Sequence, residues 1–150
     1  MQERFETFTV LISRISRDIR KIKNQEMADY HLRSVHVSCL YYVYSLGSVT
    51  SAELCEHCEE DKATISRAVD YLETNGFLLR GTSAKRYKSP LLLTEKGRDA
   101  GKRIAEKIGS ILETVSHALT ENERIEFYRC LSTISRSLEA IVQKSEEKEM

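Results

Sequence analysis

The sequence predicts a mainly α-helical protein with a small β-hairpin, arranged as a winged helix-turn-helix core flanked by N- and C-terminal helices. Three observations support this fold class. Apolar residues recur at helical spacing near both ends of the chain, and short segments with capping residues follow one another in the centre. Two β-prone runs, "GFLLR" and "SPLLLTE", then flank a polar, basic tip. We therefore expect one domain over 1–150, with its core at about 34–94 and helices at about 4–24 and 95–145.

Composition limits the possible functions. The chain has 150 residues, of which 31% are charged and 41% hydrophobic, and this balance is typical of a folded globular protein. The formal net charge is zero, so binding to nucleic acid requires a local basic patch. No apolar run is long enough to span a bilayer and no signal peptide is evident, so we expect a cytoplasmic protein without a membrane partner. In that compartment the four cysteines should be reduced.

The terminal segments carry apolar stripes that predict helices packing on other helices. The N-terminal stripe is Phe5, Phe8, Ile12, Ile15, Ile19 and Ile22, and the C-terminal stripe is Phe127, Leu131, Ile134, Leu138 and Ile141. Thr120 and Glu123 have the spacing of a capping box at the start of the C-terminal helix. Thr94 can cap another helix, which is expected at 95–119. Either stripe could pack within one chain. Because a small core has little surface on which to bury both, we favour a homodimer.

The centre consists of shorter elements. "SVHVSCLYYVYSL" favours a helix ended by Gly47, although its β-branched and tyrosine content leaves a strand as an alternative. Thr50 and Glu53 form a second capping box, and they begin a short helix whose apolar side should be Ala52, Leu54, Cys55 and Cys58. Asp61 should cap the next helix, and Asn75 with Gly76 should end it. The order helix, turn, helix, hairpin is that of a winged helix-turn-helix.

The second helix of this unit has two different sides. At 100° per residue, Ile65, Val69 and Leu72 share one side, while Ala63, Arg67, Asp70 and Thr74 lie opposite. Short side chains would let the helix enter a major groove, where Arg67 reaches guanine or phosphate. The acid-free run after it, with Arg80, Lys85, Arg86 and Lys88, would add backbone contacts. The alternatives are a solvated face, or a winged-helix module that contacts protein and has no operator.

The chain resembles the MarR family of bacterial transcriptional regulators. The resemblance rests on "TSAELCEHCEEDKATISRAVDYLETNGFLLR" and, after the wing, on "LLLTEKGRDAGKRI". It implies a homodimer that binds double-stranded DNA at a palindromic operator, usually as a repressor, and releases it when a small molecule, metal or oxidant is sensed. It also implies that Ala63, Thr64 and Arg67 face bases, that Lys62 and Ser66 face phosphates, and that Arg86 makes the wing contact, with Lys85 and Lys88 beside it.

Two departures from the family pattern affect these expectations. Lys85 and Tyr87 stand where the wing usually carries an acidic residue and an arginine, which puts the usual wing-bracing ion pair in doubt. Glu59 occupies a turn position often held by glycine, so the turn should be less regular.

The remaining candidates concern control. Tyr30, His36, Cys39, Tyr41 and Tyr44 combine apolar bodies with polar tips, so they could hold a small aromatic effector or simply fill core. "CEHC" offers zinc ligands, but we favour core packing for Cys55 and Cys58 because a fourth ligand is missing.

Other sensing roles stay open as alternatives. The resemblance allows peroxide sensing through Cys39 and metal sensing through His31, His36 or His117. We expect no metal and no cofactor. The glycines form no phosphate-binding pattern and no catalytic constellation recurs, so we expect no enzyme.

Overall fold

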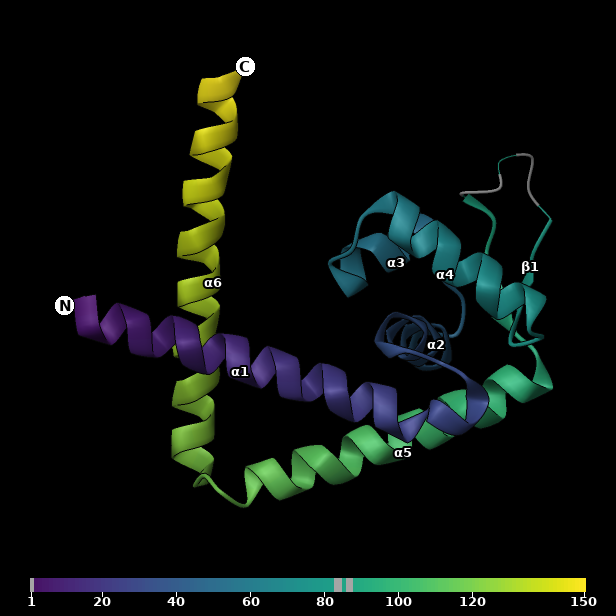
Figure 1. The fold of residues 1–150 in the computed structure, drawn as a ribbon, viewed down its shortest axis with the longest axis horizontal. Helices are drawn as coiled ribbons and strands as arrows, with labels where there is room; N and C mark the ends of the chain where they lie inside the picture. The colour runs from purple at the N-terminus through teal and green to yellow at the C-terminus, as the bar shows by residue number, and fades with distance from the viewer. Residues whose placement is uncertain (1, 83–84, 86–87) are drawn as a thin grey trace. The chain divides into compact units, whose positions relative to one another are not determined.

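A computed structural model describes residues 2–82, 85 and 88–150, and it confirms the mainly helical fold class with one small hairpin (Figure 1). The elements are α1 (Gln2–Glu26), the 3-10 turn η1 (Ala28–Tyr30), α2 (Ser34–Leu46), α3 (Ser51–Cys58), α4 (Lys62–Thr74), β1 (Leu78–Arg80), β2 (Leu91–Leu93), α5 (Glu95–Ser116) and α6 (Glu121–Glu149). They form two compact units, 1–107 and 108–150. Within the described residues, no helix has the length and apolar character needed to cross a membrane.

Local capping explains where the central helices begin and end. The segment that could have been a strand is α2, which ends at Gly47 with a φ of 84° that favours glycine. The predicted capping box at the start of α3 is present, because Thr50 Oγ1 accepts the Glu53 N–H at 3.2 Å and Glu53 Oε2 accepts the Thr50 N–H at 3.0 Å. α6 begins with the same arrangement at Thr120 and Glu123.

The helix-turn-helix unit is formed by α3 and α4, which pack on each other and on α2 (Figure 1). Their shared core is made of fully or almost fully buried apolar side chains: Val37, Leu40, Val43, Leu54, Ile65, Ala68, Val69 and Leu72. Between the two helices Glu59 adopts the left-handed conformation, with a φ of 53° and a ψ of 44°. This is the conformation that glycine adopts most easily, so Glu59 is a less suited residue at this position.

The hairpin connects α4 to α5 with few intervening residues. β1 and β2 pair antiparallel with Leu79 opposite Leu92, and the Leu91 N–H donates to the Val49 carbonyl at 2.7 Å. Thr94 follows β2 and caps α5 as predicted, since its Oγ1 accepts the Gly97 N–H at 3.0 Å. The base of the wing is therefore tied both to the segment before α3 and to the start of α5.

The structure corrects the prediction that Cys55 and Cys58 lie in the core with Leu54. Leu54 is fully buried, but both cysteines are only partly buried. α3 has 8 residues, so only the part of its surface centred on Leu54 is covered by α2 and α4, while its C-terminal turn lies at the edge of the unit. Cys39, in the middle of α2, is fully buried.

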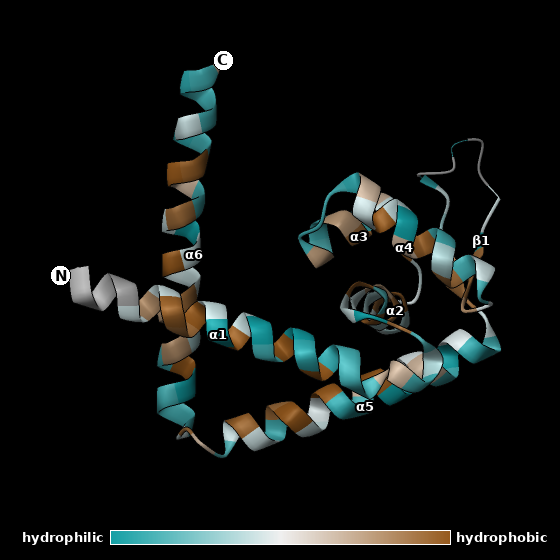
Figure 2. Ribbon diagram, viewed as in Figure 1, coloured by the Kyte–Doolittle hydropathy of each residue, from teal (hydrophilic) through white to brown (hydrophobic). Residues whose placement is uncertain are grey.

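Most described residues of the two terminal stripes are exposed. On α1, Ile12, Ile15 and Ile19 are 40%, 51% and 48% exposed. On α6, Leu138 and Ile141 are 49% and 61% exposed, and Figure 2 shows hydrophobic positions recurring along this helix. The Phe5 side chain lies outside the described residues. Most of the predicted apolar seam is thus present, and it is only partly covered within the described part of the chain.

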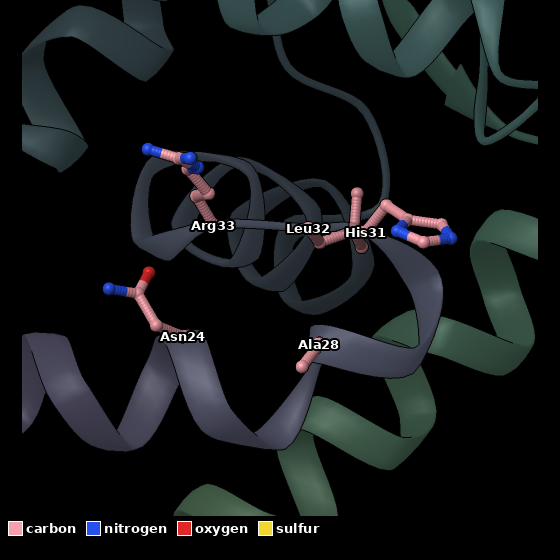
Figure 3. Close-up of a pocket in the computed structure, with 5 residues that line it drawn as sticks. All are labelled: Asn24, Ala28, His31, Leu32 and Arg33. Carbon is pink, nitrogen blue, oxygen red and sulfur yellow. The ribbon is translucent and has the colours of Figure 1, made fainter.

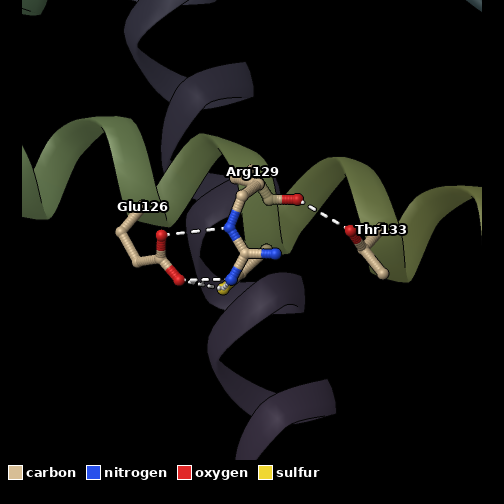
Figure 4. Close-up of polar contacts among 4 residues, drawn as sticks. Glu126, Arg129 and Thr133 are labelled. Atoms are coloured by element: carbon tan, nitrogen blue, oxygen red, sulfur yellow. Dashed lines mark hydrogen bonds and ion pairs between the residues drawn. The ribbon is translucent and has the colours of Figure 1, made fainter.

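α6 is stabilised locally by polar contacts along its own surface (Figure 4). The Arg129 guanidinium forms an ion pair with Glu126, and its Nε donates to Glu126 Oε2 at 3.0 Å. One turn further on, Thr133 Oγ1 donates to the Arg129 carbonyl at 3.0 Å. A side-chain ion pair at i,i+3 supports a helix without any partner, which suits a long helix with an exposed apolar stripe.

Candidate nucleic-acid interface

α4 is held at its N-terminus by a cap and along one side by the core. Asp61 Oδ1 accepts the Thr64 N–H at 2.7 Å, and this hydrogen bond holds the pKa of Asp61 below its usual range. The side of the helix that carries Ile65, Val69 and Leu72 is fully buried, as predicted. The helix ends at Asn75, after which Gly76 has a φ of 80°. Rotation of α4 about its own axis is therefore fixed.

This anchoring presents one face of α4 to the outside. Lys62, Ala63, Ser66 and Arg67 are exposed and Thr64 is half-buried, so the structure brings the five predicted contact residues together on the N-terminal half of the helix. Three of the five have short side chains, which leave room for close approach of a second surface. The helix N-terminus also favours negative charge.

The C-terminal half of the same face of α4 carries ion pairs that the sequence did not predict. Asp70 was expected on the free side of α4, but its Oδ1 lies 3.0 Å from Nη2 of Arg80 on β1. Arg80 Nε also lies 2.8 Å from Glu73 Oε2, and the Arg80 side chain is only 15% exposed. Arg80 therefore does not belong to the exposed basic set of the hairpin. It fixes the first strand of the wing to α4.

The tip of the hairpin carries the remaining basic residues. Lys85 and Lys88 are exposed, and the Lys88 N–H donates to the Lys85 carbonyl at 3.0 Å. The buried Ser89 donates to the same carbonyl at 3.2 Å, which anchors this end of the tip. Arg86, the predicted wing contact, and Tyr87 lie outside the described residues. The described part of the wing tip thus carries two exposed cationic side chains.

The five predicted effector residues have separate environments. His36 stacks on Tyr71 with ring centroids 4.4 Å apart, and burial, followed by the positive charge of Arg33, lowers the His36 pKa. Tyr30 meets Phe77 edge to face, Tyr41 packs on Tyr42, and Tyr44 lies against Gly101 on α5. Cys39 is fully buried. An aromatic effector site at these residues stays a prediction.

Two of the cavities beside α1 also involve the segments that follow it in the chain. One, of about 470 Å³, is lined by Asn24, Ala28, His31, Leu32 and Arg33, and Figure 3 shows the His31 and Arg33 side chains extending in different directions around it. The other, of about 620 Å³, is bordered by α1, α2 and the end of α3. Its wall combines apolar Ile12, Ile15 and Ile19 with polar and cationic groups that include Lys23 and Ser38. None of the five predicted effector residues lines either cavity.

Metal ligands are not assembled in the described part of the chain. Over 2–82, 85 and 88–150, no group of three or more histidine, cysteine or acidic side chains is arranged to hold a metal ion. His57, the imidazole of the "CEHC" motif, stacks on Tyr42 with centroids 5.0 Å apart. His117 is exposed and lies 3.9 Å from Glu113.

Known proteins similar to this chain share its fold. The NMB1585 MarR family regulator from Neisseria meningitidis superposes with a TM-score of 0.82 at 18% identity, covering 95% of this chain and 98% of its own. MepR of Staphylococcus aureus, solved in complex with DNA, gives a TM-score of 0.77 at 18% identity and covers 87% and 97%. At these identities the likeness shows the winged helix fold.

Sequence comparison adds to this likeness. The HTH-type transcriptional regulator YwoH of Bacillus subtilis (strain 168) is 26% identical over 85 residues, which are 57% of this chain and 62% of that protein. The model of the MarR family matches residues 32–85, a range that contains α2, α3, α4 and β1. The resemblance read from the motifs is therefore confirmed, and the match to the MarR family model lies over the helix-turn-helix region at 32–85.

Proposed function

We propose that this chain is a sequence-specific, double-stranded DNA-binding transcriptional regulator. The observation that carries the proposal is the exposed N-terminal half of α4, on which small side chains and the Arg67 guanidinium stand on a helix fixed by its cap and its buried side. A guanidinium recognises guanine through two parallel hydrogen bonds in the major groove. Lys85 and Lys88 on the wing supply phosphate contacts next to it.

We also propose that the active form is a homodimer on a palindromic operator. The exposed stripes on α1 and α6 support this, because rows of half-exposed isoleucine and leucine on two helices are costly to leave in water. A two-fold dimer presents two copies of α4, so the operator should consist of two inverted half-sites about one helical turn apart. We place this regulator in the cytoplasm, where its DNA would be.

Control by a small aromatic effector, with repression as the default, completes the proposal. η1 and α2 carry the proposed effector residues Tyr30, His36, Cys39, Tyr41 and Tyr44, and α2 packs both on α1 and on the helix-turn-helix unit. An effector that favours a different spacing of the two recognition helices weakens operator binding, and a tenfold effect requires about 1.4 kcal/mol of coupling. By reciprocity the operator weakens effector binding by the same factor.

The test is selection of bound fragments from random double-stranded DNA, followed by titration of the selected sequence at several salt concentrations. The proposal predicts an enriched inverted repeat and an affinity that falls steeply with salt, because bound phosphates release counterions. A module that contacts protein instead would enrich no sequence, and its partner binding would depend little on salt. Repeating the titration with phenolic acids tests the effector proposal separately.

A further inference from the structure

The link between η1 and α2, residues 31–33, is held on α4 by one aromatic side chain. The Tyr71 hydroxyl donates to the His31 carbonyl at 2.8 Å. The Tyr71 ring also stacks on the His36 ring, with centroids 4.4 Å apart and planes inclined by 21°. His31 has a φ of 58°, a conformation that a residue other than glycine keeps only when its neighbours fix it. Tyr71 thus holds the start of α2 against the C-terminal half of α4.

His36 also caps the first turn of α2. Its Nδ1 accepts the Arg33 N–H at 3.0 Å, so this nitrogen carries no proton. The next amide, that of Ser34, donates to Asn24 Oδ1 of α1 at 2.7 Å. The side chain of Asn24 does not titrate, whereas an imidazolium has a proton on both ring nitrogens and accepts no hydrogen bond. Of these two caps, the one at His36 is therefore the one that depends on pH.

The surroundings of this end of α2 oppose a proton on His36. The charged and titratable groups that line the cavity of about 620 Å³ beside the start of α2, or that contact His36, include Arg20 and Lys23 of α1, Arg33, Glu60 and Tyr71. Three of these are cations and one is a carboxylate, and a helix N-terminus itself disfavours positive charge. β2, which also packs on α2, consists of leucines. Burial, followed by the charge of Arg33, lowers the pKa of His36 from its usual value of 6.5.

We propose that His36 is a pH switch that fixes α4 for DNA binding when it is neutral and loosens it when it is protonated. A proton on Nδ1 removes the acceptor of the Arg33 N–H and adds a positive charge next to Arg33. The link that receives the hydrogen bond from Tyr71 then loses its fixed end. Attraction between an imidazolium and the Tyr71 ring acts in the opposite direction, but it does not replace the lost cap. The inference rests on the proposed function, because the orientation of α4 matters for what α4 contacts.

The direction of the pH dependence follows from the lowered pKa. The unfolded chain takes up a proton on this histidine near pH 6.5, and the folded chain does so only at lower pH. The stability that neutral His36 contributes is therefore complete above about pH 6.5, and it is lost as the pH falls through the folded-state pKa. Operator binding should weaken in the same direction, because DNA favours the form in which α4 is fixed.

The first experiment needs no DNA and follows the histidine rings and backbone amides of the full-length protein by NMR from about pH 8 to about pH 5. The His36 ring should titrate with a midpoint below 6.5, and the Arg33 amide and the Tyr71 ring should shift with the same midpoint. His36→Asn keeps an acceptor near the position of Nδ1 and does not titrate, so its Arg33 amide should not shift with that midpoint. His117→Asn, at an exposed histidine, should leave the titration of His36 unchanged.

The second experiment measures operator affinity at fixed ionic strength, at about pH 7.5 and about pH 5.5. On acidification the wild type and His117→Asn should lose about threefold to tenfold more affinity than His36→Asn, because a proton at His36 is linked to binding. Urea unfolding over the same range should show the stability of the wild type falling relative to that of His36→Asn.

The proposal is overturned if the His36 midpoint lies at or above 6.5, or if the Arg33 amide does not follow it. It is also overturned if the wild type and His36→Asn lose operator affinity equally. If no operator is bound at any pH, the proposed function fails instead, and the NMR titration with urea unfolding still decides whether His36 controls the start of α2. The wild-type NMR titration decides this even if His36→Asn impairs folding.

Discussion

Replacing Arg80 by methionine tests whether ion pairs fix the first strand of the wing to α4. Methionine keeps most of the apolar stem and removes the guanidinium that pairs with Asp70 at 3.0 Å and Glu73 at 2.8 Å. The net contribution of a hydrogen bond to a charged group is about 1.5–3 kcal/mol, and that of an exposed ion pair about 0–1 kcal/mol. The Arg80 side chain is 15% exposed, whereas the Asp70 and Glu73 side chains are 48% and 36% exposed. Water can therefore solvate the two carboxylates when the guanidinium is removed.

We therefore expect Arg80→Met to lower the free energy of unfolding by about 1–2 kcal/mol in total. For a chain of this size that corresponds to a fall in Tm of about 2–8 °C. Urea unfolding followed by circular dichroism measures the first quantity and a thermal scan measures the second. Every variant must be compared at one protomer concentration, because the proposed dimerisation would contribute to apparent stability.

The matched control is Arg98→Met on α5, where the arginine is exposed. That change should stay within about 0.5 kcal/mol of the wild type. If Arg80→Met and Arg98→Met unfold at the same urea concentration, the ion pairs with Asp70 and Glu73 do not stabilise the fold, and the account of the wing base is wrong.

Two further predictions concern packing and assembly. A Cβ at Gly97 would stand 2.0 Å from the Phe77 carbonyl oxygen, so Gly97→Ala should destabilise the protein by about 1–3 kcal/mol, whereas Gly109→Ala, with open space around it, should stabilise it by about 0.5–1 kcal/mol. Equal urea midpoints would contradict this. Replacing Ile15 and Ile19 together by glutamine should leave a monomer in sedimentation at micromolar concentration, and a wild type that is already monomeric would contradict the proposed dimer.

Features that depend on neighbouring residues could be predicted from the sequence. The caps at Thr50, Asp61, Thr94 and Thr120 and the stops at Gly47 and Gly76 are all where the local pattern indicates. The same holds for the two sides of α4, because a helix of known start and period has defined faces. These local rules place the predicted contact residues on one exposed surface before any tertiary structure is known.

Features that depend on distant residues could not be predicted in the same way. Arg80 was grouped with the basic hairpin because the run after it contains no acid, but its acidic partners precede it on α4. The alternation of β1, with Leu78 buried, Leu79 exposed and Arg80 turned back toward α4, was the available signal.

The most direct test of the central claim is the effect of Arg67→Ala on binding to the selected operator and to its single-base variants. If Arg67 reads a base edge, the change should cost about 1–3 kcal/mol, or about 5- to 150-fold in Kd, and should abolish the preference at one position of each half-site. Fluorescence anisotropy at fixed salt measures both effects, with circular dichroism confirming that the variant is folded. If wild type and Arg67→Ala give the same titration curve and the same base preferences, the exposed face of α4 does not read DNA.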